Sequence, residues 1–94
     1  MIISFKCKET SFIFDGGISK KFPVEISKIG KRKLDMLHSA FKEQDLLVPP
    51  ANRFEHLKGE LKNYCSIRIN NQYRIVFKFI NGNAEEVCIV DYHK

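Results

Sequence analysis

The sequence has no tryptophan, only three cysteines and no long apolar run. A membrane-spanning helix needs roughly 18 consecutive apolar residues, and no stretch of this chain approaches that length. The first six residues become charged too early to form a secretory signal peptide. We therefore expect a cytoplasmic protein that makes no membrane contact.

The cysteines, Cys7, Cys65 and Cys88, are odd in number and lack Cys-x-x-Cys spacing. The odd number argues against a disulfide framework, and the spacing argues against a zinc site. The sequence accordingly predicts buried thiols that pack as small hydrophobic side chains. It predicts no metal and no other cofactor.

Acidic residues are fewer than basic ones, 11 against 16, which gives a formal net charge of +5. This balance favours polyanionic partners such as nucleic acid, although it does not establish one. The length of 94 residues fits a single domain over residues 1–94, and an apolar content of 44% is enough for one core.

The first half of the chain has helical periodicity. Residues 2–6 predict a short strand, and residues 9–14 predict a short helix that ends at the breaker Asp15-Gly16-Gly17. A second helix begins near Pro23, with Gly30 inside it, and Pro49-Pro50 closes the helical half. The apolar residues at near-helical spacing are Ile26, Ile29, Leu34, Leu37 and Phe41.

The second half alternates with the period of a strand. Residues 64–69, 73–79 and 84–90 are separated by Asn70-Asn71-Gln72 and Asn81-Gly82-Asn83, which are typical of hairpin turns. Helices followed by an antiparallel meander predict an α+β fold, with two N-terminal helices packed on one face of an antiparallel β-sheet.

One hairpin register keeps the apolar side chains on a single face. Pairing Ile69 with Tyr73 aligns residue 67 with 75 and residue 65 with 77. The second hairpin then aligns residue 75 with 89, residue 77 with 87, and Lys78 with Glu86 as a favourable ion pair. The residues predicted to face the helices are Ile67, Ile75, Phe77, Val87 and Ile89.

The same register places Arg68 directly opposite Arg74 on the other face, together with Tyr92. Like charges at opposed positions destabilise a sheet. An anion between the two guanidinium groups would offset that cost, since arginine matches the oxygens of a phosphate. The alternative is that both side chains turn into solvent, or that Glu60 or another acid pairs with one of them.

Two polar clusters offer catalytic groups. Asp91-Tyr92-His93 gathers proton-handling side chains at the end of the chain, and metal-free RNA transesterification needs a base, an acid and cations. In residues 55–60, Glu55 or His56 offers a base and Lys58 a phosphate contact. The structural alternatives are a tail that covers the edge of the core and a solvated connector.

Other basic residues are candidates for the RNA backbone. Lys31, Arg32 and Lys33 predict the solvated face of the second helix, and with Arg53 they can displace counterions from RNA. We expect His38, in the same helix, to be a structural or surface residue.

Several segments in this order resemble the HigB family of plasmid-maintenance killer toxins, within the RelE/ParE superfamily. The resemblance covers essentially the whole chain. The segments that carry it are Phe12–Gly16, Arg32–Leu34, Asp45-Leu46 ahead of Pro49-Pro50, Asn52–Glu60, Tyr64–Asn70, Gln72–Ile75 and Val90–His93.

The resemblance implies a microbial-RNase-like RelE fold and metal-free mRNA cleavage in the ribosomal A site. It also implies inhibition by a HigA-type helix-turn-helix antitoxin. Asp91, Tyr92 and His93 match the active-site group of the family. Lys58 and Arg74 match cations that contact RNA or stabilise the transition state.

The chain departs from the usual His-Pro-Leu-Lys-Gly pattern of this family, because Glu55 replaces the histidine and His56 replaces the proline. Neighbouring strand residues point to opposite faces, so His56 need not take the place of that histidine, and Glu55 is a candidate for the base, which leaves the division of acid and base open. The alternative functions are a ParE-like toxin that poisons DNA gyrase and a catalytically idle module that binds RNA or an antitoxin.

Overall fold

The structure is a computed structural model that describes residues 1–92. Its helices are α1 (Lys8–Phe14) and α2 (Val24–Ser39), followed by the short 3-10 turns η1 (Glu43–Leu46), η2 (Pro50–Asn52) and η3 (Gly59–Leu61). Its strands are β1 (Glu55–His56), β2 (Cys65–Arg68), β3 (Tyr73–Ile80) and β4 (Asn83–Asp91). Within residues 1–92, no helix is long and apolar enough to cross a lipid bilayer.

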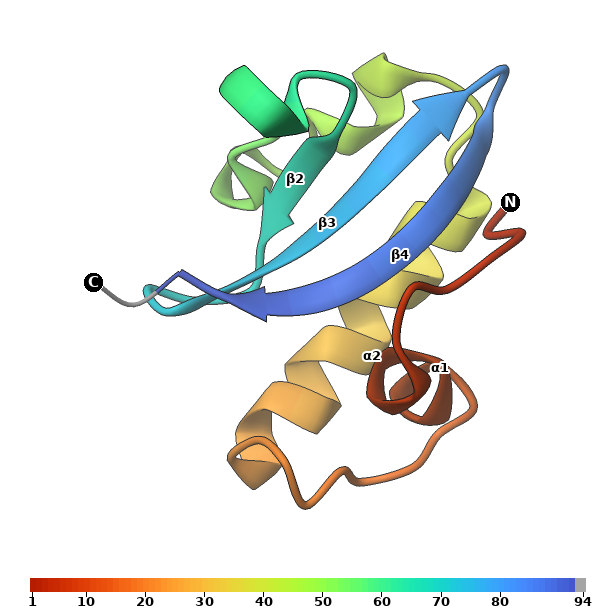
Figure 1. Cartoon of the computed structure of the whole chain (residues 1–94). Coiled ribbons are helices and arrows are strands. Elements are labelled where there is room, and N and C mark those ends of the chain that lie inside the picture. The colour runs from red at the N-terminus through yellow and green to blue at the C-terminus, as the bar shows by residue number, and fades with distance from the viewer. Residues whose placement is uncertain (93–94) are drawn as a thin grey trace.

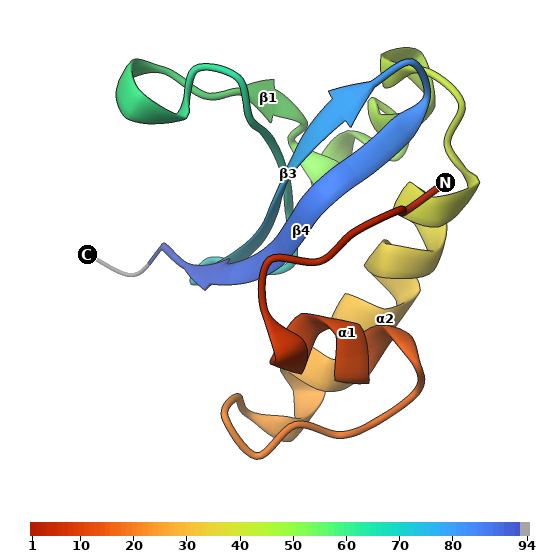
Figure 2. The ribbon, with the colours of Figure 1, turned by 45° about the vertical axis from the view of Figure 1, so that its right-hand side comes forward.

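The strands form one antiparallel sheet in the order β1-β2-β3-β4. Both helices lie on one face of this sheet (Figure 1). The segment between β1 and β2, which includes η3, projects on the other side (Figure 2). The predicted α+β architecture is therefore confirmed, and the two-residue β1 is an additional edge strand that the sequence did not predict.

The register of the first hairpin is as predicted. β2 pairs with β3 so that residue 65 faces 77, residue 67 faces 75, and Arg68 faces Arg74. The five residues predicted to face the helices are all buried: Ile67, Ile75, Phe77, Val87 and Ile89. The face that carries Arg68 and Arg74 is left open by the helices, and we call it the open face.

The second hairpin contains a β-bulge that the sequence did not predict. Ile75 pairs with Ile89 as expected, but the register shifts between Val76 and Lys78, so Lys78 faces Glu85 instead of Glu86. Glu86 is the extra residue, with a positive φ of 53°. The expected ion pair survives, because Lys78 Nζ still lies 3.0 Å from Glu86 Oε2.

The N-terminal residues do not form the predicted strand. They make two isolated parallel bridges to β4, Ile2 with Ala84 and Phe5 with Val87. His38 has the expected structural role here, since its Nδ1 accepts a hydrogen bond of 3.1 Å from the Ile2 amide. The N-terminal segment thus covers the β4 edge of the sheet without a continuous ladder.

The helical half differs from the prediction at its end. α2 stops at Ser39, and Phe41 is 84% exposed instead of facing the core. Inside α2, Gly30 has a packing role, since a Cβ there would lie 3.2 Å from Ile89 Cδ1. The glycine therefore lets α2 approach the sheet closely.

Candidate active site

Arg74 is the centre of the polar group on the open face. Its Nε donates to Ser66 Oγ at 2.8 Å, and one terminal nitrogen donates to the Arg53 carbonyl oxygen at 2.6 Å. Its side chain is only 11% exposed. These bonds fix the plane of the guanidinium, and burial lowers the pKa of Arg74 although an arginine stays charged.

Two elements bring Ser66 and Arg53 to this arginine. Ser66 lies on the open face of β2 and is fully buried. Arg53 directly follows η2 and has a positive φ of 45°. Ser66 was not among the residues predicted for the site, although the predicted register already placed it diagonally across from Arg74 on the same face.

Glu55 is the acid that joins this group. It pairs with Ser66 across β1 and β2, so both side chains belong to the open face. Glu55 Oε1 lies 3.9 Å from Arg74, and its side chain is 54% exposed. The acid beside the arginine pair is therefore Glu55 and not Glu60, and it remains open to solvent.

Arg68 lies opposite Arg74 but turns outward. Its guanidinium donates to the Asn71 side-chain oxygen in the adjacent turn. The two arginines thus have separate partners, which reduces the repulsion between them, and both guanidinium groups stay on one face. An anion that binds between them would gain contact with two cations.

The C-terminal triplet is divided by the structure. The Tyr92 ring stacks below the Arg74 guanidinium, 5.7 Å from its carbon to the ring centre. Asp91 pairs with Tyr73, whose ring packs against Phe22 on the helix side, and cross-strand partners share a face. Asp91 therefore points away from Tyr92, and its carboxylate accepts a bond of 3.2 Å from Gln72. His93 lies outside the described residues.

An apolar groove continues the open face beyond Arg74. It has a volume of about 370 Å³, and its lining includes Tyr64, Val76, Cys88, Val90 and Tyr92. Glu86 closes one side, where it accepts hydrogen bonds from the Tyr64 hydroxyl at 2.8 Å and from Lys78. These bonds, first that from Lys78, hold the pKa of Glu86 below its ordinary value. Two tyrosines beside a cationic group form a surface on which nucleobases can stack.

The predicted RNA-contacting residues have different surroundings. Lys58 and Arg53 are exposed beside β1, and Arg32 is exposed on α2, which covers the opposite face. Lys31 pairs with Asp35 at 2.7 Å.

Lys33 corrects the expectation of a solvated basic face on α2. It is 5% exposed, and its ammonium donates to the Asn52 side-chain oxygen. Burial lowers the pKa of Lys33. Lys33 therefore joins α2 to η2 inside the protein and is not available to RNA.

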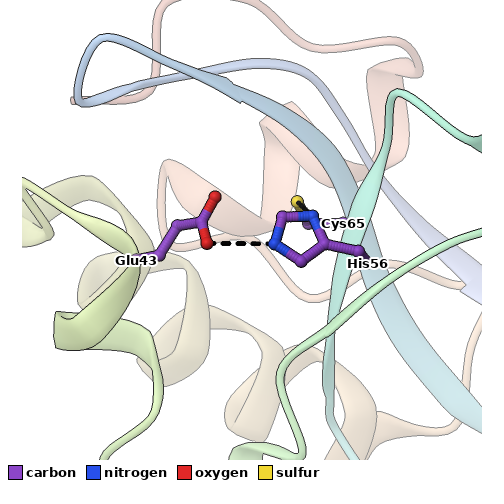
Figure 3. Close-up of side chains that lie close together, drawn as sticks. All are labelled: Glu43, His56 and Cys65. Carbon is purple, nitrogen blue, oxygen red and sulfur yellow. Dashed lines mark hydrogen bonds and ion pairs between the residues drawn. The ribbon is translucent and has the colours of Figure 1, made fainter.

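His56 points away from the open face, as strand alternation predicted. Its Nε2 lies 3.0 Å from Glu43 Oε1, and its Nδ1 lies 3.5 Å from Cys65 Sγ (Figure 3). Burial, followed by the charge of Glu43, raises the pKa of Cys65 to about 11. A protonated, buried thiol is a poor nucleophile, so this chain of groups is not a nucleophilic triad.

The same three residues are the candidates for a metal. Within residues 1–92, Glu43, His56 and Cys65 are the one group of three whose ligand atoms lie within 4.8 Å of one another. The carboxylate and the thiol contact different nitrogens of one ring (Figure 3). In the structure these contacts link the three side chains into a hydrogen-bonded chain.

Comparison with known proteins gives a consistent set of relatives. Residues 4–93 match the family model described as the RelE-like toxin of type II toxin-antitoxin system HigB. Toxin HigB-1 of Vibrio cholerae serotype O1 is 43% identical, over 100% of this chain and 99% of that protein. Endoribonuclease HigB of Proteus vulgaris is 34% identical, over 99% of this chain and 100% of that protein.

A solved structure has the same fold. It is the YoeB-YefM toxin-antitoxin complex from Staphylococcus aureus, in which the matched chain superimposes with a TM-score of 0.60 at 20% identity. The match covers 100% of this chain and 99% of that one.

Proposed function

This chain belongs to the HigB family of RelE-like toxins of type II toxin-antitoxin systems, and on that premise we propose that it is an endoribonuclease that cuts mRNA in the ribosomal A site. The observation that carries the proposal is the open-face group, in which Arg74 is held by Ser66 and the Arg53 carbonyl beside Glu55 and Tyr92. The related Proteus vulgaris protein, named an endoribonuclease, supports it.

The proposed reaction is a metal-free transesterification. Glu55 removes the proton of the ribose 2′-hydroxyl, and the resulting oxygen attacks the adjacent phosphorus. Arg74 stabilises the negative charge that develops on the phosphoryl oxygens. His93, next to Tyr92 in the chain, donates a proton to the leaving 5′-oxygen. Tyr92 stacks on a nucleobase and holds the scissile nucleotide.

The remaining basic residues bind the RNA backbone in this proposal. Arg68 faces Arg74 across β2 and β3, the Arg53 backbone contacts Arg74, and Lys58 follows β1. Asp91 acts indirectly, since its position opposite Tyr73 fixes the end of β4 that leads to Tyr92. Lys31 and Arg32 contact the ribosome from α2.

We further propose that the inhibitor is a HigA-type helix-turn-helix antitoxin. Its basis is the family, together with the toxin-antitoxin complex that shares the fold. A cytoplasmic location follows from a reaction on ribosomes.

A reconstituted translation system and a parallel reaction of gyrase with plasmid DNA separate the three possible functions. Wild-type protein, Arg74→Gln and the exposed-residue control Lys20→Ala are added to ribosomes stalled with a defined codon in the A site. The proposal predicts cleavage within that codon by wild type and Lys20→Ala only. DNA cleavage by gyrase without loss of mRNA would favour the ParE-like alternative, and no effect on either nucleic acid would favour an idle binding module.

A further inference from the structure

Two cysteines that are far apart in the sequence meet at the β4 edge. Cys7 Sγ lies 2.9 Å from Cys88 Sγ, although 81 residues separate them. Cys7 is the last residue before α1, and Cys88 lies within β4. The N-terminal segment brings them together, because its bridges at Ile2 and Phe5 hold it alongside β4.

We propose that Cys7 and Cys88 are a redox-sensitive pair that forms an intramolecular disulfide when the protein meets a small disulfide such as oxidised glutathione. Both are free thiols in the structure, and both are half-buried, in contrast to the fully packed thiols that the sequence predicted. Disulfides of cytosolic proteins are usually transient and redox-sensing. The inference does not depend on the proposed cleavage reaction.

The surroundings of the two thiols give them different roles. Burial acts to raise the pKa of Cys7, but hydrogen bonds with Cys88 and Thr10 outweigh it, and the net pKa lies below the ordinary value. Burial, followed by the hydrogen bond and charge of Cys7, raises the pKa of Cys88 to about 12. The contacts agree with this difference, because the Thr10 hydroxyl accepts from the Ile89 amide at 2.9 Å and can therefore donate its own proton to Cys7 Sγ, 2.9 Å away. Since the thiolate is the attacking species, Cys7 attacks first and Cys88 resolves.

Small oxidants can reach this pair. Both cysteines line a surface groove of about 360 Å³, whose walls include Lys21, Phe22 and Tyr73. Cys65 has no comparable access, since it is 4% exposed and lies against His56. The chain therefore contains a matched internal control, a third thiol that we expect to remain reduced.

The exchange proceeds in two balanced steps. The Cys7 thiolate attacks one sulfur of oxidised glutathione, which forms a mixed disulfide and releases one glutathione thiolate. The Cys88 thiol then loses its proton to solvent and attacks Cys7 Sγ, which forms the Cys7–Cys88 bond and releases the second glutathione. The protein loses two electrons and two protons, and oxidised glutathione is reduced to two thiols.

The bond would stabilise the fold. It would join the N-terminal segment covalently to the strand that leads to Tyr92, and it would close most of the chain into a loop. Cross-links over long loops stabilise mainly by constraining the unfolded chain. We expect the melting temperature of the oxidised form to exceed that of the reduced form by about 5 °C or more.

Titration with glutathione buffers of increasing oxidised fraction tests the inference. After acid quenching and alkylation, mass spectrometry counts the free thiols and peptide mapping locates any bond. We expect wild type and Cys65→Ser to form the Cys7–Cys88 bond, which dithiothreitol reverses. Cys88→Ser should stop at the glutathione adduct on Cys7, and Cys7→Ser should form neither product readily.

Three results would overturn the inference, provided that circular dichroism shows each variant to be folded. The first is a wild-type protein that keeps three free thiols in fully oxidised glutathione. The second is an intramolecular bond that involves Cys65 in place of Cys7 or Cys88. The third is a Cys7–Cys88 bond that leaves the melting temperature unchanged or lowers it.

Discussion

At the scale of single residues, Arg74 can be placed in a site from the sequence, but its contribution to stability cannot be predicted from the sequence. The alternation of β2 and β3 was enough to place Arg74 opposite Arg68 and to suggest a phosphate between them. The alternative was that both arginine side chains turn into solvent, where such a side chain contributes little to stability. In the structure that side chain is 11% exposed and bonded to Ser66 and the Arg53 carbonyl.

Removing Arg74 entirely would therefore disturb folding as well as chemistry. Truncation to alanine leaves the fully buried Ser66 hydroxyl without its donor, which costs about 1–3 kcal/mol. A polar substitute of similar length is the better probe of catalysis. The Arg53 bond depends on a positive φ just after η2, and no periodic pattern in the sequence predicts such a conformation.

Glu55 and His56 provide a matched pair of adjacent residues for testing the base. Glu55 faces Arg74, whereas His56 faces Glu43 and Cys65. We expect Glu55→Gln to lower single-turnover mRNA cleavage by about 10²-fold or more, the usual contribution of one acid–base group. His56→Gln should change the rate by less than about threefold, since it removes no proton-handling group from the open face.

Rates for both variants on programmed ribosomes, with thermal melts alongside, check this prediction. If His56→Gln lost activity and Glu55→Gln kept it, the base would lie on the other face of β1. Sequence alone left that choice to the rule of strand alternation, which the two-residue strand β1 follows.

The elements show which parts of the fold follow from pattern and which depend on local detail. The register of β2 and β3 follows from alternation, because a shift by one residue would move every apolar side chain to the open face. The bulge in β4 does not follow from alternation, because one extra residue in a strand does not change the kinds of residue that the strand contains. Likewise Lys33 lies in a basic run but belongs to the interior because η2 folds against α2 and supplies Asn52.

Lys33 and Arg32 are neighbours that should respond in opposite ways to substitution. Lys33→Ala removes the donor to the fully buried Asn52 side chain. We expect it to lower the free energy of unfolding by about 1–3 kcal/mol. Arg32→Ala, at an exposed position, should change it by less than about 0.5 kcal/mol. Urea denaturation measures the free energy of unfolding of both variants. Equally small effects of the two substitutions would mean that Lys33 is a surface cation.

The bulge residue Glu86 combines a favourable ion pair with an unfavourable backbone conformation. Its φ is 53°, where a side chain other than glycine costs about 1–2 kcal/mol, and it bonds Lys78 and Tyr64. Glu86→Ala and Glu86→Gly lose the same bonds, but only glycine releases the strain. We expect Glu86→Gly to be the more stable variant by about 1 kcal/mol.

Chemical denaturation of the two variants decides this point. A more stable alanine variant would mean that Glu86 does not hold its positive φ in solution. Glu86→Gly should also reduce the loss of the free energy of unfolding as the pH is lowered, because the pKa of Glu86 is depressed in the folded protein. Stability from such a carboxylate is present above its unfolded pKa and is lost as the pH falls through its folded pKa.

At the scale of the whole molecule, the two faces of the sheet differ, since one is covered by helices and the other is the open face. α1 and α2 cover one face of the sheet and complete the core, so the proposed catalytic groups lie on the other face (Figures 1 and 2). The formal charge of +5 favours RNA as the substrate. Arg53 and Arg68 supply cations near Arg74, and Lys58 supplies another just after β1.

Binding to ribosomes should accordingly weaken as salt rises. If three or four of these cations contact phosphates, raising the salt from about 50 to 200 mM should weaken binding on the order of 10- to 100-fold. Lys58→Ala should reduce the slope of the logarithmic plot by about 0.7–0.9. Affinity measured by filter binding checks both values, and a binding constant that ignores salt would contradict an electrostatic footprint.

The single-turnover rate of mRNA cleavage by Arg74→Lys on programmed ribosomes tests directly whether cleavage depends on the Arg74 guanidinium. Lysine keeps the charge but cannot reproduce the fixed guanidinium that Ser66 and the Arg53 carbonyl hold in place. We expect the cleavage rate of Arg74→Lys to fall by about 10²-fold or more, while its affinity for ribosomes stays within about threefold of wild type. The control Lys20→Ala should cleave at the wild-type rate. A folded Arg74→Lys protein that cuts mRNA at the wild-type rate would contradict this dependence on the guanidinium.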